Sequence, residues 1–423
     1  MTNIGTDLKC KKDIIICGGG LSGITAALAA RREGKDVLLI ERYGFLGGHA
    51  TNALVSPFMN YYERHPEGWQ KQGNIANGGL FLDIVNTLFE HKGIDEEWKQ
   101  IFDQEVLKYV LQIMLQRAGV QVLLHTFLAD VKKDGDTVTS IICATKAGLI
   151  EFSAKCFVDA TGDADLSRFA NAEIEIGREE DGLCQPMTLF FRLANVAKNI
   201  DNDELQSKYR AAKARGEIKN PRENVAVGPT LCEGVYSFNS TRVLGKSPMD
   251  LKSFTAAEFE GREQVFEMRD FLRREVRGFE NAHLIMTAPQ IGVRESTRII
   301  GDYVLTVDDL TNTVKFDDSI ARGVYPVDIH NPTGSGTDFR EIPPLDYYTI
   351  PYRSLTPVNL RNVIVAGRPI SSTHGAHSAI RVMSICASVG EGAGTAAALF
   401  EGDFHKVDAK SIQGLLSKNN GVY

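Results

Sequence analysis

The chain has few cysteines, no long hydrophobic run and no surplus of positive charge, and each absence excludes a class of protein. Its seven cysteines are widely spaced along 423 residues and include no Cys-x-x-Cys pair, which argues against a disulfide framework and against a metal site. No apolar stretch is long enough to cross a membrane, so we expect no membrane insertion. The net charge of −7 provides no basic surface, so we expect no nucleic-acid partner.

The composition is otherwise that of a globular protein. Hydrophobic residues make up 43% of the chain and charged residues 24%, and the length is sufficient for two or three domains. The N-terminal residues 1–12 are polar and contain no apolar core of a signal peptide. Together with the unpaired cysteines, which suit a reducing compartment, this predicts a cytoplasmic protein.

A glycine-rich segment near the N-terminus is the strongest positive signal. The sequence GGGLSG over residues 18–23 follows an apolar, β-branched run at 13–17 and precedes apolar residues at helical spacing. Strand, glycine turn and helix in this order are typical of a loop that binds the phosphates of a dinucleotide at the helix N-terminus. The candidate binding residues of this loop are Gly18, Gly20, Leu21, Ser22 and Gly23.

The three spaced glycines have different predicted roles. Gly18 permits the tight turn, Gly20 lets the backbone approach a pyrophosphate, and Gly23 allows the helix to pack closely on the strand. A second strand over residues 37–40 ends at Glu41, whose carboxylate would accept hydrogen bonds from an adenosine ribose and repel a 2′-phosphate. These residues leave NAD and FAD open as the cofactor.

The segment 41–51 carries a second glycine pair, Gly47 and Gly48, soon after the acidic residue. This spacing resembles the FAD-binding motif of the glutathione reductase superfamily, in which the pair lies against the flavin-side phosphate and the ribityl chain. The resemblance adds Arg42 and Thr51 to the candidate cofactor residues. The disulfide branch of that superfamily is excluded, because no closely spaced cysteine pair is present.

Further motifs extend the resemblance over nearly the whole chain. An Ala-Thr-Gly triplet at 160–162 ends another predicted strand, and Gly-Arg at 367–368 follows the apolar strand 363–366. With the segments 292–303 and 350–355, these motifs resemble a family of bacterial FAD-dependent oxidoreductases whose cofactor domain is of the succinate dehydrogenase and fumarate reductase type. The resemblance implies noncovalent FAD, with candidate contacts at Ala160, Thr161, Gly162, Gly367 and Arg368.

The family resemblance also implies cofactor contacts at two other places. A long small-residue helix is predicted from about Ala379 to Glu401, and its N-terminal amides would face the flavin pyrimidine. Ala379, Ile380 and Arg381 are therefore candidates for contacts near the ring. Leu128 matches the family position whose backbone contacts adenine.

The order of predicted elements gives an α/β fold class with a discontinuous, Rossmann-like FAD-binding domain and an inserted α+β substrate or cap domain. The predicted FAD-binding domain comprises residues 1–55, 103–170 and 350–423. Residues 56–102 form an insertion near the cofactor, and residues 171–349 form the cap domain. The detailed interpretation predicts separate strands at 149–152 and 156–160, a strand-like run at 225–238 and a helix at 259–276.

Candidate catalytic residues come from the segments that border the predicted flavin edge. His374 and His377 are predicted on a loop before the closing helix, where either imidazole could donate or accept a proton, or bond only to the backbone. Arg294 and Arg298 share one face of an extended chain, where they would clamp a carboxylate or form structural salt bridges. His49, beside the glycine pair, is a further candidate for ring contact. We take His374, His377 and Arg294 as the catalytic candidates.

The function predicted from these motifs is an FAD-dependent dehydrogenase or reductase that transfers hydride between flavin N5 and a small organic substrate. The electron donor or acceptor is not readable from the sequence. One alternative is a flavin monooxygenase or oxidase, and another is an FAD-binding protein without redox turnover, such as a component of a tRNA-modifying assembly. An NAD-dependent dehydrogenase with a single Rossmann domain would leave the C-terminal return to the cofactor domain unexplained.

Overall fold

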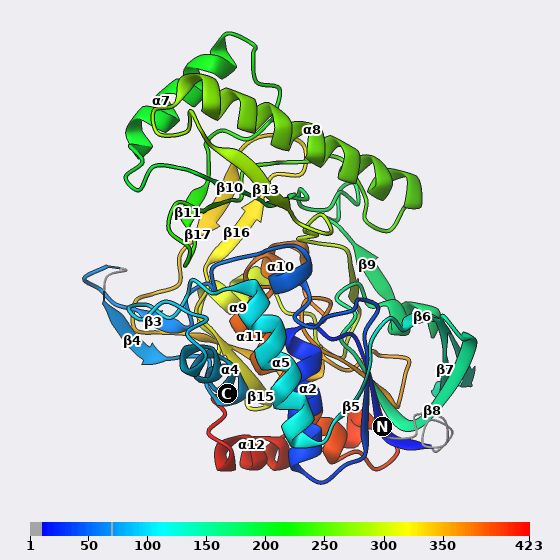
Figure 1. Cartoon of the computed structure of the whole chain (residues 1–423). Helices are drawn as coiled ribbons and strands as arrows, with labels where there is room; N and C mark the ends of the chain where they lie inside the picture. The colour runs from blue at the N-terminus through cyan, green and yellow to red at the C-terminus, as the bar shows by residue number, and fades with distance from the viewer. Residues whose placement is uncertain (1–10, 69–70) are drawn as a thin grey trace.

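A mostly parallel sheet lies at the centre of the cofactor domain. The computed structural model describes residues 11–68 and 71–423. The sheet has the order β5-β2-β1-β8, all parallel, and β19 pairs with the other side of β8 (Figure 1). Its strands are β1 (Lys12–Cys17), β2 (Val37–Ile40), β5 (Gln121–Leu123), β8 (Gly148–Asp159) and β19 (Val363–Val365). The predicted α/β fold class with a Rossmann-like sheet is confirmed.

Strand β8 takes part in two kinds of pairing. Its first half pairs antiparallel with β7 (Thr137–Thr145), which in turn pairs with β6 (Phe127–Asp134). Its second half, from Ala154, pairs parallel with β1 and then with β19. The prediction of two separate strands at 149–152 and 156–160 was therefore wrong, because Ser153, Ala154 and Lys155 continue one extended chain from the hairpin into the parallel sheet.

Two helices from opposite ends of the chain pack against each other beside this sheet. α2 (Leu21–Arg32) follows the glycine loop, and α11 (Met383–Ala398) lies near the C-terminus. The Thr25 hydroxyl donates to the Ala387 carbonyl oxygen at 2.7 Å, across 362 residues of sequence. Gly390 and Gly394 allow this approach, because a Cβ at either position would lie 2.6 Å from a Cα atom of α2. The cofactor domain is thus assembled from distant parts of the chain, as predicted.

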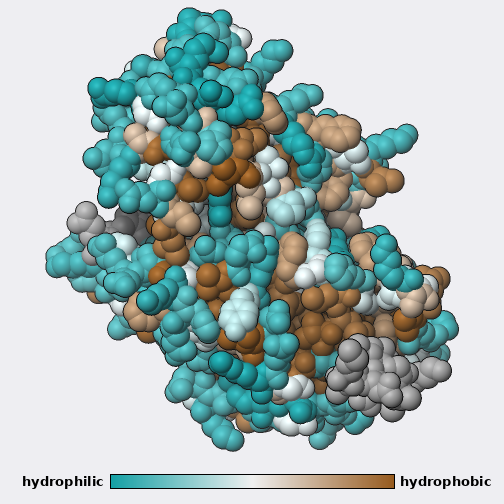
Figure 2. All heavy atoms as spheres, in the orientation of Figure 1, coloured by the Kyte–Doolittle hydropathy of each residue, from teal (hydrophilic) through white to brown (hydrophobic). Residues whose placement is uncertain are grey.

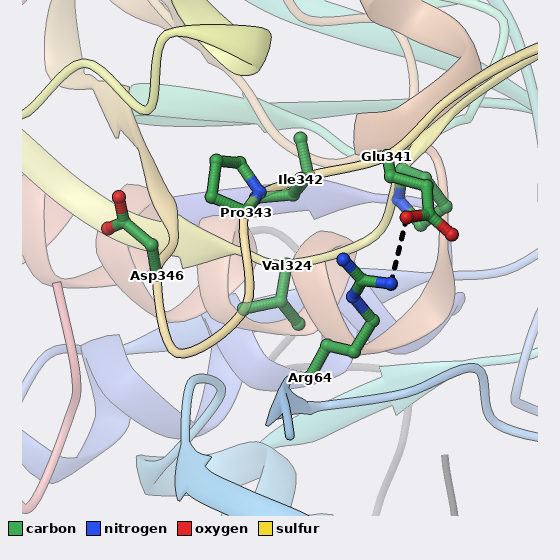
Figure 3. Close-up of a pocket in the computed structure, with 7 residues that line it drawn as sticks. Arg64, Val324, Glu341, Ile342, Pro343 and Asp346 are labelled. Atoms are coloured by element: carbon green, nitrogen blue, oxygen red, sulfur yellow. Dashed lines mark ion pairs between the residues drawn. The ribbon is translucent and has the colours of Figure 1, made fainter. Parts of the chain in front are cut away.

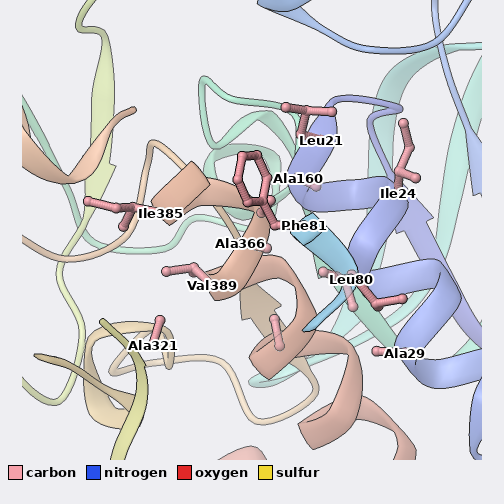
Figure 4. Close-up of a cluster of buried hydrophobic side chains, with 14 of the residues drawn as sticks. Leu21, Ile24, Ala29, Leu80, Phe81, Ala160, Ala321, Ala366, Ile385 and Val389 are labelled. Carbon is pink, nitrogen blue, oxygen red and sulfur yellow. The ribbon is translucent and has the colours of Figure 1, made fainter. Parts of the chain in front are cut away.

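Apolar side chains from several elements fill the core around these helices. Figure 4 shows Leu21 and Ile24 of α2, Leu80 and Phe81, and Ile385 and Val389 of α11 in one buried cluster. Helices α3 (His49–Asn52), α4 (Gly79–Glu90), α5 (Gln104–Ala118) and α12 (Ala409–Lys418) also contribute to this cluster, whereas α6 (Asp165–Phe169) packs in a separate buried cluster with β1 and β8. The predicted insertion at 56–102 supplies α4 and a hairpin of β3 (Tyr62–Arg64) and β4 (Gln72–Ile75).

A separate antiparallel sheet with its own core forms the cap (Figure 1). Its order is β11-β12-β10-β13, with β10 (Phe191–Ala194), β11 (Val227–Pro229), β12 (Tyr236–Phe238) and β13 (His283–Thr287). The run at 225–238 is therefore a hairpin of two short strands and not one strand. Helices α7 (Asn202–Ala214) and α8 (Leu251–Glu275) bury apolar faces in the cap core, and the surface around α7 is mostly hydrophilic (Figure 2).

The chain between the cap and β19 consists of short ladders and helices. These are β14 (Thr297–Ile299), α9 (Val307–Thr311), β15 (Ser319–Gly323), β16 (Val327–His330), β17 (Thr337–Arg340) and β18 (Tyr348–Pro351). β9 (Ile174–Ile176), which precedes the cap sheet, pairs with β14, and α10 (His374–Ile380) follows β19. Buried residues of this region, among them Leu305, Ala321 and Ile342, pack in the same cluster as α2 and α11. The predicted domain boundaries stay predictions.

Candidate functional site

The glycine loop has the two steric features predicted for Gly18 and Gly23. Gly18 follows β1 with φ +107°, and a Cβ there would lie 2.7 Å from the carbonyl carbon of Ala160. A Cβ atom added at position 23 would overlap the Gly18 carbonyl oxygen, so the absence of a side chain lets the helix pack directly on the loop. Gly20 differs, because a Cβ there would meet nothing nearer than the Cα of Gly48 at 3.8 Å. The outer side of Gly20 is therefore open to a ligand.

The second glycine pair lies against the first loop. The Gly47 amide donates to the Gly19 carbonyl oxygen at 2.8 Å, and Gly48 has φ +55° at the start of α3. The Thr51 hydroxyl holds the turn closed through the Leu46 carbonyl oxygen at 2.7 Å. Gly20 is the N-cap of α2 and supplies no side chain, so no side chain caps the first amides of that helix. Two adjoining glycine turns and an uncapped helix N-terminus are suited to phosphate oxygens.

A crevice of about 50 Å³ extends from this loop along the edge of the sheet. Glu41 lines it and accepts hydrogen bonds from the Gly19 amide at 2.6 Å and the Tyr43 amide at 2.9 Å. Burial raises the pKa of Glu41 above its ordinary value, although the amide hydrogen bonds oppose the shift. Five of the residues predicted from sequence to bind the cofactor line this crevice: Gly18, Glu41, Arg42, Leu128 and Thr161.

The ends of β8 and β19 hold a buried ion pair next to the loop. Arg368 donates from Nη2 to Asp163 Oδ1 at 2.6 Å and from Nη1 to the Ser296 hydroxyl at 3.2 Å. Burial alone would raise the pKa of Asp163, but the charge of Arg368 lowers it below its ordinary value. Gly367 has φ +88°, and a Cβ there would lie 3.0 Å from the Cβ of Ser22. The predicted contacts at 160–162 and 367–368 therefore adjoin the glycine loop.

A larger cavity of about 550 Å³ lies between the cofactor domain and the cap. The cofactor domain contributes His49 of α3, and the cap contributes Val227 of β11 and Ser237 of β12. Apolar side chains such as Phe190 and Val293 line much of it. Its charged and imidazole side chains are His49, Arg222, Arg294, Asp328, His330, Arg368 and Arg381.

Asp328 is the centre of a hydrogen-bonded network in this cavity. It accepts from the Tyr325 hydroxyl at 3.2 Å, and its Oδ2 lies 3.4 Å from His330 Nε2 and 3.8 Å from Arg381 Nη2. Burial alone would raise the pKa of Asp328, but His330 and the charges of Arg381 and Arg294 lower it. Burial, with the charge of Arg294, lowers the pKa of His330 to about 3. At neutral pH the network thus holds a carboxylate and a neutral imidazole.

His49 is the second neutral imidazole of the cavity. Burial and the charge of Arg368 lower its pKa to about 3. It is the first residue of α3, directly after Gly48, so the second glycine turn places it at the cavity wall.

The structure separates the two arginines that the sequence placed on one face. Arg298 is buried and pairs with Glu295 at 2.5 Å, which is the structural salt bridge that the sequence left open. Arg294 faces the cavity, where its Nη1 donates to the Pro186 carbonyl oxygen at 2.7 Å and to the Thr188 hydroxyl at 2.5 Å. Burial lowers the pKa of Arg294 well below its ordinary value, and the charge of Arg381 adds to this.

The candidate histidines lie on a helix and not on the predicted loop. His374 begins α10, with Nδ1 2.9 Å from Glu295, and it lines a different cavity of about 620 Å³ beside the segment 331–338. His377 is fully buried, and neither ring nitrogen has a hydrogen-bond partner within the described residues. Burial, and next the charge of Arg298, lowers the pKa of His377 well below its ordinary value.

The closing helix is interrupted, which changes the interpretation of its N-terminus. α10 ends at Ile380, and α11 begins only at Met383 after an extended Val382. Ala379 and Ile380 are therefore buried in the last turn of α10, and the prediction that the long helix begins at Ala379 was wrong. Arg381 lies in the break and lines the large cavity.

Sequence reasoning missed most polar residues of the cavity, among them Arg222, Ser237, Asn239, Tyr325, Asp328 and His330. Asp328 and His330 had a readable signal, since they alternate with Val327 and Ile329 on β16 and so share one face of a strand. Arg222 lies in a cap loop after α7, where nothing in the local sequence indicates a cavity.

A smaller pocket is lined by Arg64, Val324 and Glu341 (Figure 3). Arg64 of β3 pairs there with Glu341 at 2.8 Å, next to Pro343 and Val324. Its volume of about 10 Å³ has room for about one water molecule. The ion pair therefore connects the β3–β4 hairpin to the segment after β17, and the pocket is too small for a ligand.

No group of three histidine, cysteine, aspartate or glutamate side chains among residues 11–68 and 71–423 is placed to hold a metal ion. No helix in that part of the chain is long and apolar enough to span a membrane.

A family profile matches nearly the whole chain. The sequence profile of the family described as FAD dependent oxidoreductase matches residues 13–416. NADH:fumarate oxidoreductase of Klebsiella pneumoniae (strain 342) is 23% identical over 187 residues, which cover 36% of this chain and 20% of that protein. Dihydrolipoamide dehydrogenase of Chaetomium thermophilum is 25% identical over 199 residues, 41% of this chain and 37% of that protein.

The alignments thus span 20% and 37% of these two relatives. Among solved structures, a geranylgeranyl bacteriochlorophyll reductase-like protein from Thermoplasma acidophilum gives a TM-score of 0.48 at 13% identity. That alignment covers 97% of this chain and 84% of the other.

Proposed function

This chain belongs to the FAD dependent oxidoreductase family, and from that premise we propose that it exchanges a hydride between FAD and a small organic substrate bound in the 550 Å³ cavity. The observation that carries the proposal is the position of this cavity. His49 and Arg368 of the cofactor domain adjoin the segments that the family resemblance assigns to the flavin. Both line the cavity, together with cap residues such as Asn239. A substrate held there adjoins both domains.

The residues at the loop fit FAD. The uncapped N-terminus of α2, the open side of Gly20 and the crevice at Glu41 form one continuous edge for a dinucleotide. When bound, FAD supplies an acceptor and donor of hydride at its N5 atom. The two adjoining glycine turns support placing this domain in the glutathione reductase superfamily, with a cofactor domain of the succinate dehydrogenase and fumarate reductase type.

The cavity residues divide the remaining work between binding and proton transfer. For an alcohol or amine substrate, hydride leaves the carbon and a proton leaves the attached oxygen or nitrogen, giving a carbonyl or imine. The Nε2 atom of His330 faces Asp328, which Tyr325 orients, and its Nδ1 lies 3.2 Å from the Thr337 hydroxyl. The pKa of about 3 makes this imidazole a weak base, so it acts as a hydrogen-bond acceptor that takes the proton only as hydride leaves the substrate. Arg294 holds the substrate. His374 and His377 stay predictions as proton-transfer groups. The reverse direction uses the same groups, and a separate electron donor or acceptor completes the turnover.

The first test is the absorption spectrum of the purified protein, before and after anaerobic addition of hydroxy acids, sugars and amines. We expect bound flavin, released by heat, whose absorption bleaches with one class of compound. Oxygen consumption during turnover would instead favour the oxidase or monooxygenase alternative. A protein that binds no FAD even after reconstitution overturns the proposal.

Three variants then separate the histidines. His330→Asn, His374→Asn and His377→Asn are compared with His91→Asn, which changes an exposed histidine outside the cavities. Loss of a proton-transfer group lowers the rate of flavin reduction by roughly 100-fold or more while the FAD content stays unchanged. We expect this result for His330. An unchanged rate in His330→Asn contradicts its role.

A further inference from the structure

The cavity contains more guanidinium groups than carboxylates. Arg222, Arg294, Arg368 and Arg381 line it, while Asp328 is its one acidic lining residue among those the structure describes. Arg368 is paired with Asp163, and Arg381 with Asp328. Arg222 and Arg294 have no described carboxylate oxygen within 4.0 Å. His49 and His330 are neutral at pH 7, since burial lowers the pKa of each to about 3, so they add no charge.

The two unpaired guanidinium groups belong to one group of polar side chains on the cap. We define the cap-side polar cluster as Arg222, Ser237, Asn239 and Arg294, all of which line the cavity. Arg222 Nε and the Ser237 hydroxyl oxygen are buried and have no hydrogen-bond partner in the described part of the chain. Arg294 Nη2 donates to Asn239 Oδ1 at a long 3.4 Å. The cluster therefore contains hydrogen-bond donors that have no acceptor in the described part of the protein.

The position of Arg222 is fixed by its backbone. Its carbonyl oxygen accepts from the Lys213 ammonium at 2.6 Å and from the Tyr209 hydroxyl at 3.1 Å, and both partners lie on α7. The side chain itself makes no hydrogen bond in the protein. Arg222 is half-buried, and its Nε atom is the buried donor without a partner. An unsatisfied guanidinium donor at a cavity wall favours a ligand that supplies both an acceptor and a counter-charge.

From this cluster we infer that the substrate is an organic carboxylate, whose two oxygens bind between Arg222 and Arg294 with the Ser237 hydroxyl as a further donor. The inference rests on the proposed function and specifies its substrate class. A planar carboxylate suits the donors, because two donors of Arg294 are already used by Pro186 and Thr188, and a three-oxygen phosphate would need more. The apolar walls at Phe190 and Val293 accommodate the uncharged remainder of the acid.

The test uses FAD-loaded protein and matched probes that differ in charge. Acetate, propionate and benzoate are each compared with the corresponding amide, and phenyl phosphate is included. Binding is followed by the change in the flavin absorption spectrum and by calorimetry. We expect at least one acid to bind about tenfold or more tightly than its amide. Equal binding of every pair, or tighter binding of phenyl phosphate than of benzoate, overturns the inference.

Two variants locate the preference. Arg222→Gln should lose the preference for acid over amide, because the guanidinium that supplies the counter-charge is removed. Arg222→Lys should retain part of the preference. Arg215→Gln is the matched control, since Arg215 pairs with Glu217 on the exposed surface of the cap. Retention of the full preference in Arg222→Gln contradicts the inference.

The design keeps the two proposals apart. Flavin content and its reduction report on the proposed function, whereas calorimetry with the acids can also be done on protein freed of FAD. If the flavin is bound and reducible but acids bind no more tightly than amides, the proposed function stands and only the inference of a carboxylate substrate is overturned.

Discussion

The close contact between α2 and α11 makes a quantitative prediction about one glycine. Gly394 of α11 faces α2, and a Cβ there would lie 2.6 Å from the Cα of Ala26 and 2.7 Å from its carbonyl carbon. These are backbone atoms of a buried helix, so no side-chain rotation relieves the overlap. Gly394→Ala therefore requires the two helices to separate.

The magnitude follows from two opposing terms. Replacing glycine by alanine inside a helix gains about 1 kcal/mol from helix propensity. Overpacking costs about 1–3 kcal/mol, and the rigid contact here points to the upper end of that range. We expect Gly394→Ala to lower the free energy of unfolding by about 2 kcal/mol, which corresponds to about 2 °C in the thermal midpoint of a chain of 423 residues.

Gly414 of α12 provides the matched control. It is also a helical glycine, but it is exposed and a Cβ there meets no atom within 4 Å. Gly414→Ala should therefore gain up to about 1 kcal/mol from propensity alone. Both variants are measured by thermal and denaturant unfolding of the FAD-free protein. If Gly394→Ala is as stable as Gly414→Ala, the close packing of α2 on α11 is refuted.

Three further predictions concern the site. Gly20→Ala should leave the stability of the FAD-free protein unchanged, because φ at Gly20 is −71° and the space around it is open. The same variant should weaken FAD binding about tenfold or more in a fluorescence titration. An unchanged FAD affinity would contradict a phosphate at Gly20. His330 has its pKa lowered to about 3 in the folded state, so the unfolded chain takes up the proton first and stability falls as pH drops below about 6.5. Between pH 6.5 and 5 this loss amounts to about 2 kcal/mol, and His330→Asn should remove it in urea unfolding, whereas exposed His91→Asn should not. Asp163→Asn leaves Arg368 buried without its partner and should cost about 3 kcal/mol, while Asp181→Asn, at an exposed pair with Arg178, should destabilise the protein much less. Similar losses in both variants would show that burial of the pair has no effect.

The cofactor loop could be predicted from sequence because its signals are local. A buried strand, a glycine turn and a helix follow one another within residues 12–32, where Gly18 has a positive φ and a Cβ at position 23 would overlap the Gly18 carbonyl oxygen. The same holds for α5, where Asp103 caps the first amides and Gly119 adopts the left-handed conformation at the end.

The cavity could not be predicted in the same way, because it forms from contacts between distant segments. Arg222 comes from a cap loop and Asp328 from β16, and only the tertiary structure brings both to one cavity. The interruption of the closing helix was missed for a related reason. Residues 379–383 contain neither glycine nor proline, so the apolar periodicity continues through the break at Val382, where the backbone is extended.

The contact between Thr25 and Ala387 has a consequence for folding during translation. At about 5–20 residues per second, the partner of α2 is synthesised roughly 20–70 s after α2 itself. During that interval the newly made α2 lacks the surface that covers it in the native state, so it is exposed to chaperones and to aggregation. A chain truncated before α11 would therefore lack the helix that covers α2, and its N-terminal nucleotide-binding unit would stay incomplete.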